Sequence, residues 1–349
     1  MIGQEALIQL LCDMIATPSF SREEGAVADL LFGSLAAWGL DVHRCGNNLW
    51  IESEPAGDKP TLLLNAHIDT VRPASGYSRD PFTPVLEDGR LWGLGSNDDG
   101  GSVVALLDAF QRLAARPQPY RLVWSATAEE EVCGENGVSA MIPEIGPVRL
   151  GIIGEPTQMR LAVAERGLMV LDCTSHGRSG HAARDEGDNA LYHALDDIAW
   201  LRSYRFDKVS DYLGPVKMSV TMISAGTQHN VVPDVCRFVV DVRPNGLYSN
   251  REIYETIAAH LHADVVPRSL RHNSSHIDPA HPVVKRAVSL GLDTFGSPTT
   301  SNQTVLDFDT VKIGPGDSAR SHTADEYICL DEIWQGSDIY CKLLDALSI

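Results

Sequence analysis

A strongly apolar stretch near the beginning of the chain, LLLNAHIDTV at residues 62–71, stops at two polar side chains. Three leucines in a row are typical of a strand that is buried on both faces. His67 and Asp69 follow directly. Polar residues occur wherever a strand meets water, but ligands of open α/β sheets bind beyond the carboxyl ends of the strands. Two interpretations are therefore open, an ordinary strand end and a metal ligand at the mouth of a site.

Helical and strand patterns alternate on both sides of this stretch. We expect helices at 3–16, 23–38 and 101–114, and strands at 48–53, 61–66, 120–127 and 149–154. This alternation is typical of a parallel or mixed sheet with helices on both faces. The predicted fold class is α/β, with a three-layer domain on a mixed, mostly parallel sheet. We assign residues 1–166 and 273–349 to this domain.

The middle of the chain, residues 167–272, follows a different order of elements. Its patterns indicate a strand, a helix, two strands, a second helix and a last strand, which is the order of a ferredoxin-like α+β domain. The second helix opens with Ser249 followed by Glu252, a capping-box pattern. We predict that this segment is a separate domain inserted into the first.

Composition limits the class of protein. The length of 349 residues favours about two domains, and a net charge of −19 without any lysine or arginine run argues against a nucleic-acid partner. No apolar run approaches ~18 residues, so we expect no membrane span. The first 20 residues have the spacing of an amphipathic helix rather than a signal peptide. Seven cysteines without a CxxC pair favour a reducing compartment, and the cytoplasm is the expected location.

Acidic side chains follow two other predicted strands. The run Glu129–Glu131 comes after one strand of the buried type, and Glu155 comes after the next. A glutamate run is usually a solvated face. Because the carboxyl ends of parallel strands meet at one edge of a sheet, however, we expect these carboxylates to gather near His67. Several carboxylates at one site repel strongly unless cations are present.

Two further segments carry residues of the same kind. In GRLWGLGSNDDGG, residues 89–101, Asp98 and Asp99 stand between a glycine-rich turn and a predicted helix. Helix-capping aspartates are common at such positions, and the turn lacks the lysine of a phosphate-binding P-loop. In KIGPGDSARSHTADE, residues 312–326, His322 follows a glycine-proline loop. We interpret Asp98 as a cation ligand and His322 as an imidazole partner of the carboxylates.

These residues together form the donor set of a two-metal centre. Zinc binds imidazole and carboxylate ligands, and a pair of zinc ions needs a bridging carboxylate, terminal ligands and a base. The chain supplies them as His67, Asp98, Glu130, Glu131, Glu155 and His322. We predict two Zn²⁺ ions, with Co²⁺ or Mn²⁺ as alternatives.

Seven motifs in order along the chain support this hypothesis: HID, GLGSNDDGG, TAEEE, GEPT, GRSGHAA, NVVPD and GPGDSARSHTADE. With them the chain resembles the M20 family of zinc-dependent amidohydrolases and peptidases over essentially its whole length. Within that family it is most similar to acetylornithine deacetylases and succinyl-diaminopimelate desuccinylases. The resemblance implies that His67 and Glu155 bind one metal, that Glu131 and His322 bind the other, and that Asp98 bridges both.

The resemblance also implies roles for residues around the metals. Glu130 would be the general base, and Asp69 would fix the tautomer of His67. His181 would reach across the interface of a homodimer to stabilise the oxyanion in the partner's site, although a plain surface histidine is the alternative. Asn230 and Arg243 would approach the substrate carboxylate, with an ordinary structural arginine as the alternative for Arg243. The inserted segment would then be a lid and dimerisation domain.

The implied activity is hydrolysis of the amide bond in an N-acyl amino acid. N-acetylornithine, cleaved to ornithine and acetate in arginine biosynthesis, is the first candidate. The alternatives are a desuccinylase acting on N-succinylornithine or N-succinyl-diaminopimelate, a dipeptidase or aminoacylase of the same family, and a catalytically silent binding protein. The chain has Asp98-Asp99-Gly100-Gly101 where the family commonly has Asp-Met-Lys-Gly. This change of charge beside the site weakens any transfer of substrate specificity.

Overall fold

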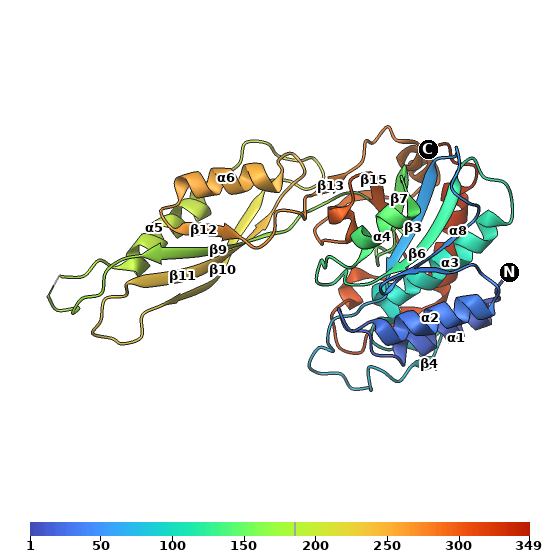
Figure 1. The fold of residues 1–349 in the computed structure, drawn as a ribbon, viewed down its shortest axis with the longest axis horizontal. Coiled ribbons are helices and arrows are strands. Elements are labelled where there is room, and N and C mark those ends of the chain that lie inside the picture. The colour runs from blue at the N-terminus through green and yellow to red at the C-terminus, as the bar shows by residue number, and fades with distance from the viewer. Residues whose placement is uncertain (185) are drawn as a thin grey trace. The chain divides into compact units, whose positions relative to one another are not determined.

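The computed structural model describes residues 1–184 and 186–349, and these residues form two compact units (Figure 1). The main unit comprises Met1–Val163, His276–Phe295 and Ser301–Ile349, and the inserted unit comprises Ala164–Ser275 and Gly296–Thr300. The prediction assigned the short segment Gly296–Thr300 to the three-layer domain, whereas the structure places it in the inserted unit. It packs in the inserted unit because Arg166 N donates to Ser297 O at 3.1 Å and an Arg243 N–H donates to Thr300 Oγ1 at 3.3 Å.

The main unit contains a mixed sheet whose central strands are parallel. The sheet order is β1 (His43–Cys45), β2 (Asn48–Glu52), β6 (Arg121–Thr127), β3 (Thr61–His67), β7 (Leu150–Ile153), β15 (Asp309–Lys312), β8 (Leu161–Glu165) and β13 (Ser275–His276), with β14 (Thr294–Ser297) beside β8. The pairs β6–β3, β3–β7 and β7–β15 are parallel. Antiparallel pairs flank them, β1–β2 and β2–β6 on one side and β15–β8 on the other. The predicted α/β fold is thus confirmed.

Both faces of the central strands are buried, as their unbroken apolar runs predict. Every residue of β3 and β6 is buried. Leu62 and Leu64 belong to a large core cluster, which includes residues of the helices α1 (Gln4–Ile15), α2 (Gly25–Ala37), α3 (Gly101–Ala114), α7 (Pro282–Ser289) and α8 (Leu330–Leu344). Leu63 belongs to a smaller cluster with residues of α4 (Val138–Ile145). Alternate leucines therefore join helices on opposite faces, which gives three layers. No helix of the described residues is long and apolar enough to cross a membrane.

A small antiparallel sheet, which the sequence pattern did not indicate, lies next to the glycine-rich turn. It consists of β16 (Tyr327–Cys329), β5 (Arg90–Trp92) and β4 (Val85–Glu87). Three one-turn segments also belong to the main unit: η1 (Ser96–Gly100), η2 (Asn302–Val305) and η3 (Ser318–Arg320). η1 leads directly into α3, so Asp98 stands between the small sheet and a core helix.

The inserted unit has the predicted ferredoxin-like order of elements. It runs β9 (Met169–His176), α5 (Ala190–Ser203), β10 (Lys217–Ala225), β11 (Val235–Arg243), α6 (Asn250–His260) and β12 (Asp264–Pro267). Its antiparallel sheet has the order β10-β11-β9-β12. The capping box of Ser249 and Glu252 is present at the start of α6. That this unit mediates dimerisation stays a prediction.

Candidate metal centre

The central parallel strands deliver the candidate ligands to one edge of the sheet. His67 is the last residue of β3 and pairs in register with Thr127, the last residue of β6. The glutamate run 129–131 follows β6, and Glu155 follows β7 in the same way. The loop after β15 leads through η3 to His322. The parallel order explains why residues so distant in sequence come together at one site.

Two groups of side chains at this edge have ligand atoms within 4.8 Å of one another. They are His67 with Glu130 and Glu131, and Asp98 with Glu131 and His322. Asp98 presents one oxygen to each histidine: its Oδ1 lies 3.1 Å from His67 Nε2, and its Oδ2 lies 3.7 Å from His322 Nε2. Glu131 Oε1 lies 2.9 Å from His322 Nε2. A carboxylate shared between two imidazoles is the arrangement that a bridging ligand requires.

Glu155 belongs to neither group among the described residues, although the resemblance pairs it with His67. Besides Asp98, the carboxylate beside His67 is that of Glu130, whose Oε2 lies 3.9 Å from His67 Nε2. Burial raises the pKa of Glu155 well above its ordinary value, the charge of Lys312 opposes the rise, and Glu130 and Asp98 add to it. Glu155 therefore interacts electrostatically with the residues of both groups.

Crowding of buried carboxylates dominates the electrostatics of the site. Burial and the neighbouring acids raise the pKa of Glu130 well above its usual value, and burial raises that of Glu131. The hydrogen bond to Glu131 raises the pKa of His322 to about 9. The anionic forms repel one another in a region of low dielectric, and divalent cations relieve that repulsion. Two imidazoles and several carboxylates are ligands that zinc accepts, so this donor set fits a two-metal centre.

Asp69 contacts both His67 and the loop that carries the glutamate run. His67 Nδ1 lies 2.9 Å from the main-chain oxygen of Asp69 and 3.5 Å from its Oδ1. Both are acceptors for a proton on Nδ1, while Nε2 faces the carboxylate of Asp98. The Asp69 carboxylate itself accepts from Ser21 Oγ at 2.7 Å and from the backbone N–H groups of Glu130 and Glu131 at 2.9 and 3.1 Å. It therefore fixes the loop that carries both glutamates.

A second buried carboxylate, Glu24, supports the same loop and was missed from the sequence. It is fully buried, and it accepts from the backbone N–H of Glu129 at 3.2 Å and from Asn47 Nδ2 at 3.2 Å. Together with Asp69 it binds every backbone N–H of residues 129–131. Glu129 points away from the metal ligands, because its carboxylate accepts from Asn136 Nδ2 at 2.8 Å. No sequence signal separates Glu24 from an ordinary helix-starting glutamate.

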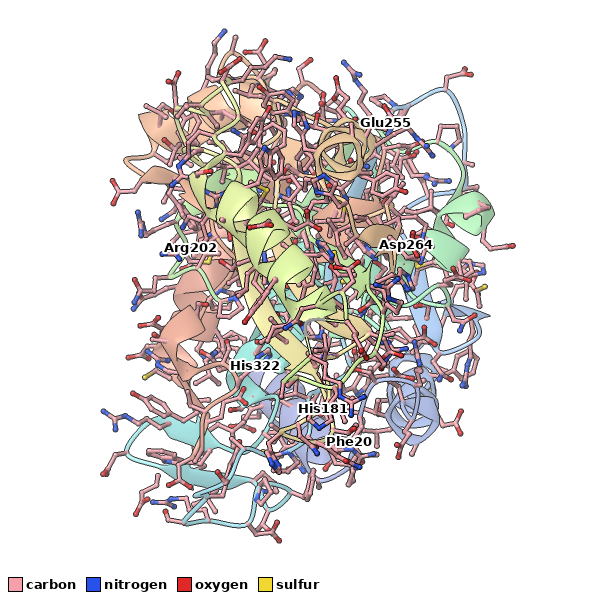
Figure 2. The ribbon with its side chains drawn as sticks, turned by 90° about the vertical axis from the view of Figure 1, so that its left-hand side faces the viewer. Phe20, His181, Arg202, Glu255, Asp264 and His322 are labelled. Atoms are coloured by element: carbon pink, nitrogen blue, oxygen red, sulfur yellow. The ribbon has the colours of Figure 1, made fainter. Side chains whose placement is uncertain are left out.

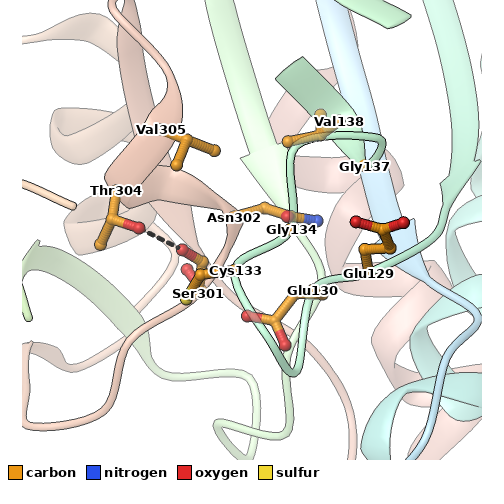
Figure 3. A pocket seen from close by; sticks show the side chains of 10 residues that line it. All are labelled: Glu129, Glu130, Cys133, Gly134, Gly137, Val138, Ser301, Asn302, Thr304 and Val305. Atoms are coloured by element: carbon orange, nitrogen blue, oxygen red, sulfur yellow. Dashed lines mark hydrogen bonds between the residues drawn. The ribbon is translucent and has the colours of Figure 1, made fainter. Parts of the chain in front are cut away.

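A small hollow opens beside Glu130 (Figure 3). Its lining includes Cys133, Val138, Ser301, Asn302, Thr304 and Val305. Asn302, one of the lining residues, donates a hydrogen bond from its Nδ2 to Asn65 Oδ1 at 2.9 Å. The sequence pattern did not single out residues 301–305, because they form a short 3₁₀ turn without a charged side chain.

The remaining predicted residues belong to the inserted unit. His181 is exposed, and its Nδ1 accepts from the backbone N–H of Ala183 at 3.1 Å (Figure 2). Asn230 lies on the adjacent loop, since its carbonyl accepts from Ala182 N at 3.1 Å. Arg243 ends β11 and contacts both Asp241 oxygens, at 2.8 and 3.0 Å. The structure thus places His181 and Asn230 side by side, whereas the Arg243 guanidinium already has a carboxylate partner.

Comparison with known protein families agrees with this geometry. Residues 63–346 match the family described as peptidase family M20/M25/M40. The chain belongs to this family. The resemblance found in the motifs is thereby confirmed, and the protein is a hydrolase that acts on amide bonds. The two groups of ligand atoms described above are the candidate metal ligands of this chain.

Two curated relatives are succinyl-diaminopimelate desuccinylases. The protein of Paracidovorax citrulli (strain AAC00-1) is 30% identical over 246 residues, which cover 63% of this chain and 63% of the relative. The protein of Halorhodospira halophila (strain DSM 244 / SL1) is 26% identical over 381 aligned positions, with 98% of each chain covered.

Solved structures share the fold at lower identity. A tripeptidase from Staphylococcus aureus subsp. aureus Mu50 has a TM-score of 0.77 at 20% identity and covers 99% of this chain and 98% of its own. A dinuclear metal-binding peptidase of the M20 family from Bacillus subtilis has a TM-score of 0.72 at 15% identity, with coverage of 98% and 97%. At these identities the likeness establishes the architecture.

Metal binding should release protons near neutral pH. With its pKa at about 9, His322 is protonated at pH 7 in the metal-free protein, and a metal requires the neutral ring. Protons compete with metal below that pKa, so we expect the apparent affinity for Zn²⁺ to rise from pH 7 towards pH 9. Calorimetric titration in two buffers of different ionisation enthalpy counts the released protons. A binding heat that does not depend on the buffer would contradict this prediction.

Proposed function

We propose that this protein removes the acyl group from an N-acyl amino acid with the help of two metal ions. The observation that carries the proposal is Asp98, whose two oxygens face His67 and His322 at 3.1 and 3.7 Å. The motifs made N-acetylornithine the first candidate. The two desuccinylase relatives favour an N-succinyl amino acid, so N-succinyl-diaminopimelate and N-succinylornithine now stand beside it. The ornithine substrates would place the enzyme in arginine synthesis.

Zinc is the proposed metal because the ligands are imidazole and carboxylate groups, with cobalt or manganese as substitutes. His67, Asp98 and Glu155 would hold one ion, and Asp98, Glu131 and His322 would hold the other. When bound, the ions supply Lewis acidity towards the amide carbonyl and the attacking water. The side chain of His322 is 53% exposed, so an ion held there would be accessible to a substrate.

Glu130 is the proposed general base. Its carboxylate belongs to the metal-ligand group around His67 and also lines the hollow beside the centre. In the metal-free protein burial and the acids around it raise its pKa, and a carboxylate placed beside the attacking water can act as a general base. In the proposed reaction Glu130 takes a proton from the attacking water and returns it to the leaving nitrogen. The backbone hydrogen bonds of Asp69 hold it in place during both transfers.

We also propose a homodimer in the cytoplasm, with substrate contacts from the inserted unit. β10 is an edge strand of that unit, and its Met222 and Ile223 are 64% and 49% exposed. Exposed apolar edge strands are templates for pairing with another chain. In such a dimer His181 would stabilise the oxyanion of the partner's reaction, and Asn230 would contact the substrate. Arg243 would have to share its guanidinium between Asp241 and a substrate carboxylate.

Substitution of base and ligand should have different effects. We expect Glu130→Ala to retain both metals and to lower kcat about 10²–10⁴-fold, because the proton acceptor is lost while the bridging Asp98 stays. His322→Ala should lower the occupancy of one metal. Metal analysis and kinetics on both variants test this, with the exposed Glu144→Ala on α4 as the control. Loss of metal from Glu130→Ala would show that Glu130 is a ligand and that the proposed base is wrong.

A comparison of substrates tests the proposed activity. Amine release would be measured on N-acetylornithine, N-succinylornithine and N-succinyl-diaminopimelate, with zinc or cobalt present. We expect clear turnover of at least one of them, and the best substrate identifies both the acyl group and the amino acid. Preference for the diaminopimelate compound would place the enzyme in lysine and cell-wall synthesis. No turnover of any of the three by metal-loaded protein would contradict the proposed substrate class.

A further inference from the structure

One buried carboxylate outside the ligand groups binds the turn that carries Asp98. Glu326 is 2% exposed. Its Oε1 accepts from the backbone N–H groups of Asn97 and Asp98, both at 2.9 Å, and its Oε2 accepts from Gly95 N at 3.1 Å. Three N–H groups of one short turn therefore converge on a single side chain.

This turn has few other acceptors for its N–H groups. Gly95 has a φ of 76°, and Asp98 departs from helical geometry inside η1, so the regular hydrogen bonds of a helix are interrupted there. Buried backbone N–H groups need a partner. Glu326 supplies it for three of them, and it reaches the N–H of Asp98 itself. The position of the Asp98 carboxylate consequently depends on a residue more than two hundred positions later in the chain.

Glu326 is itself held by the small sheet. Its main-chain oxygen accepts from Gly93 N at 3.0 Å, and the next residue, Tyr327, pairs with Trp92 across β16 and β5. The Tyr327 and Trp92 rings lie 4.6 Å apart. The guanidinium of Arg320 lies 4.6 Å from the centre of the Tyr327 ring. A residue fixed in this way keeps its side chain in one place, which is what precise support of a ligand requires.

The same segment also carries a metal ligand. His322 stands four residues before Glu326, and the Asp98 oxygens face His322 on one side and His67 on the other. We propose that Glu326 is a positioning residue of the metal centre: by binding the N–H groups of residues 95–98, it fixes the bridging Asp98 and ties it to the segment of His322. This inference rests on the proposed function, because it presumes that Asp98 binds two ions.

Glu326 acts through the backbone and is not a further ligand. Both of its oxygens accept backbone N–H groups, and it belongs to neither group of ligand atoms in the described residues. In Glu326→Gln an amide nitrogen replaces one of these oxygens, so at least one N–H of the turn would face another donor. Glu326→Asp keeps the charge but withdraws it by one methylene group. Loss of such support typically weakens metal binding about 10- to 100-fold.

The test measures metal binding rather than turnover. Zn²⁺ affinities of the wild-type protein, Glu326→Gln, Glu326→Asp and His322→Ala would be determined by competition with a chromophoric chelator. The rise in unfolding temperature on adding Zn²⁺ would be measured for each. Glu87→Gln is the matched control, because Glu87 lies on the same small sheet but is exposed and contacts a side chain, Arg79, at 2.6 Å.

We expect Glu326→Gln to bind both ions about 10-fold or more weakly, because Asp98 is common to both sites. Its gain in unfolding temperature from Zn²⁺ should shrink, whereas Glu87→Gln should behave like the wild type. His322→Ala should weaken only one ion. If Glu326 merely supported the fold, the metal-free and the metal-loaded protein would lose stability equally.

Wild-type affinities for both ions in Glu326→Gln would overturn the inference, and so would the loss of the His322 ion alone. If Glu326→Gln does not fold, Glu326→Asp decides: weaker binding of both ions supports the inference and unchanged binding overturns it. A wild-type protein that binds no metal would instead refute the proposed function, on which the inference rests.

Discussion

Repulsion between buried carboxylates is the interaction on which the rest of the site depends. The parallel strands β3, β6 and β7 end at the same edge and bring acidic residues there from three separate segments. Burial keeps water from screening their charges, which is why the pKa values of Glu130, Glu131 and Glu155 all rise. Bound protons or cations relieve such crowding. In the proposed centre two metal ions would supply the positive charge, and the imidazoles of His67 and His322 would complete their coordination.

Backbone N–H groups fix the turns that carry the candidate ligands, independently of any ion. Glu24 and Asp69 bind the N–H groups of residues 129–131, and Glu326 binds those of the Asp98 turn. These three carboxylates accept backbone N–H groups, and they belong to neither candidate ligand group in the described residues. The ligand-bearing turns are thereby fixed by buried acids that belong to distant elements. Turns that are already ordered lose less conformational freedom when a metal binds, which favours binding.

The sequence predicted those features that follow from strand periodicity and from strand direction. The unbroken apolar runs of β3 and β6 identified buried central strands, and the polar residues after them indicated the edge where a site forms. The small sheet was not predictable, because each of its strands has three residues and shows no clear period. The supporting roles of Glu24 and Glu326 were not predicted, because no local sequence pattern indicates that a carboxylate accepts backbone N–H groups of a distant segment. The proximity of Glu130 rather than Glu155 to His67 depends on side-chain direction beyond a strand end, which periodicity does not determine.

The most direct test of this account is a crystal structure of the Zn²⁺-loaded protein with anomalous diffraction data at the zinc edge. The account predicts two anomalous peaks about 3.5–4 Å apart, with one Asp98 oxygen on each, His67 beside the first and His322 beside the second. A single peak, or two peaks without Asp98 between them, would contradict the central claim that this carboxylate joins two metal sites.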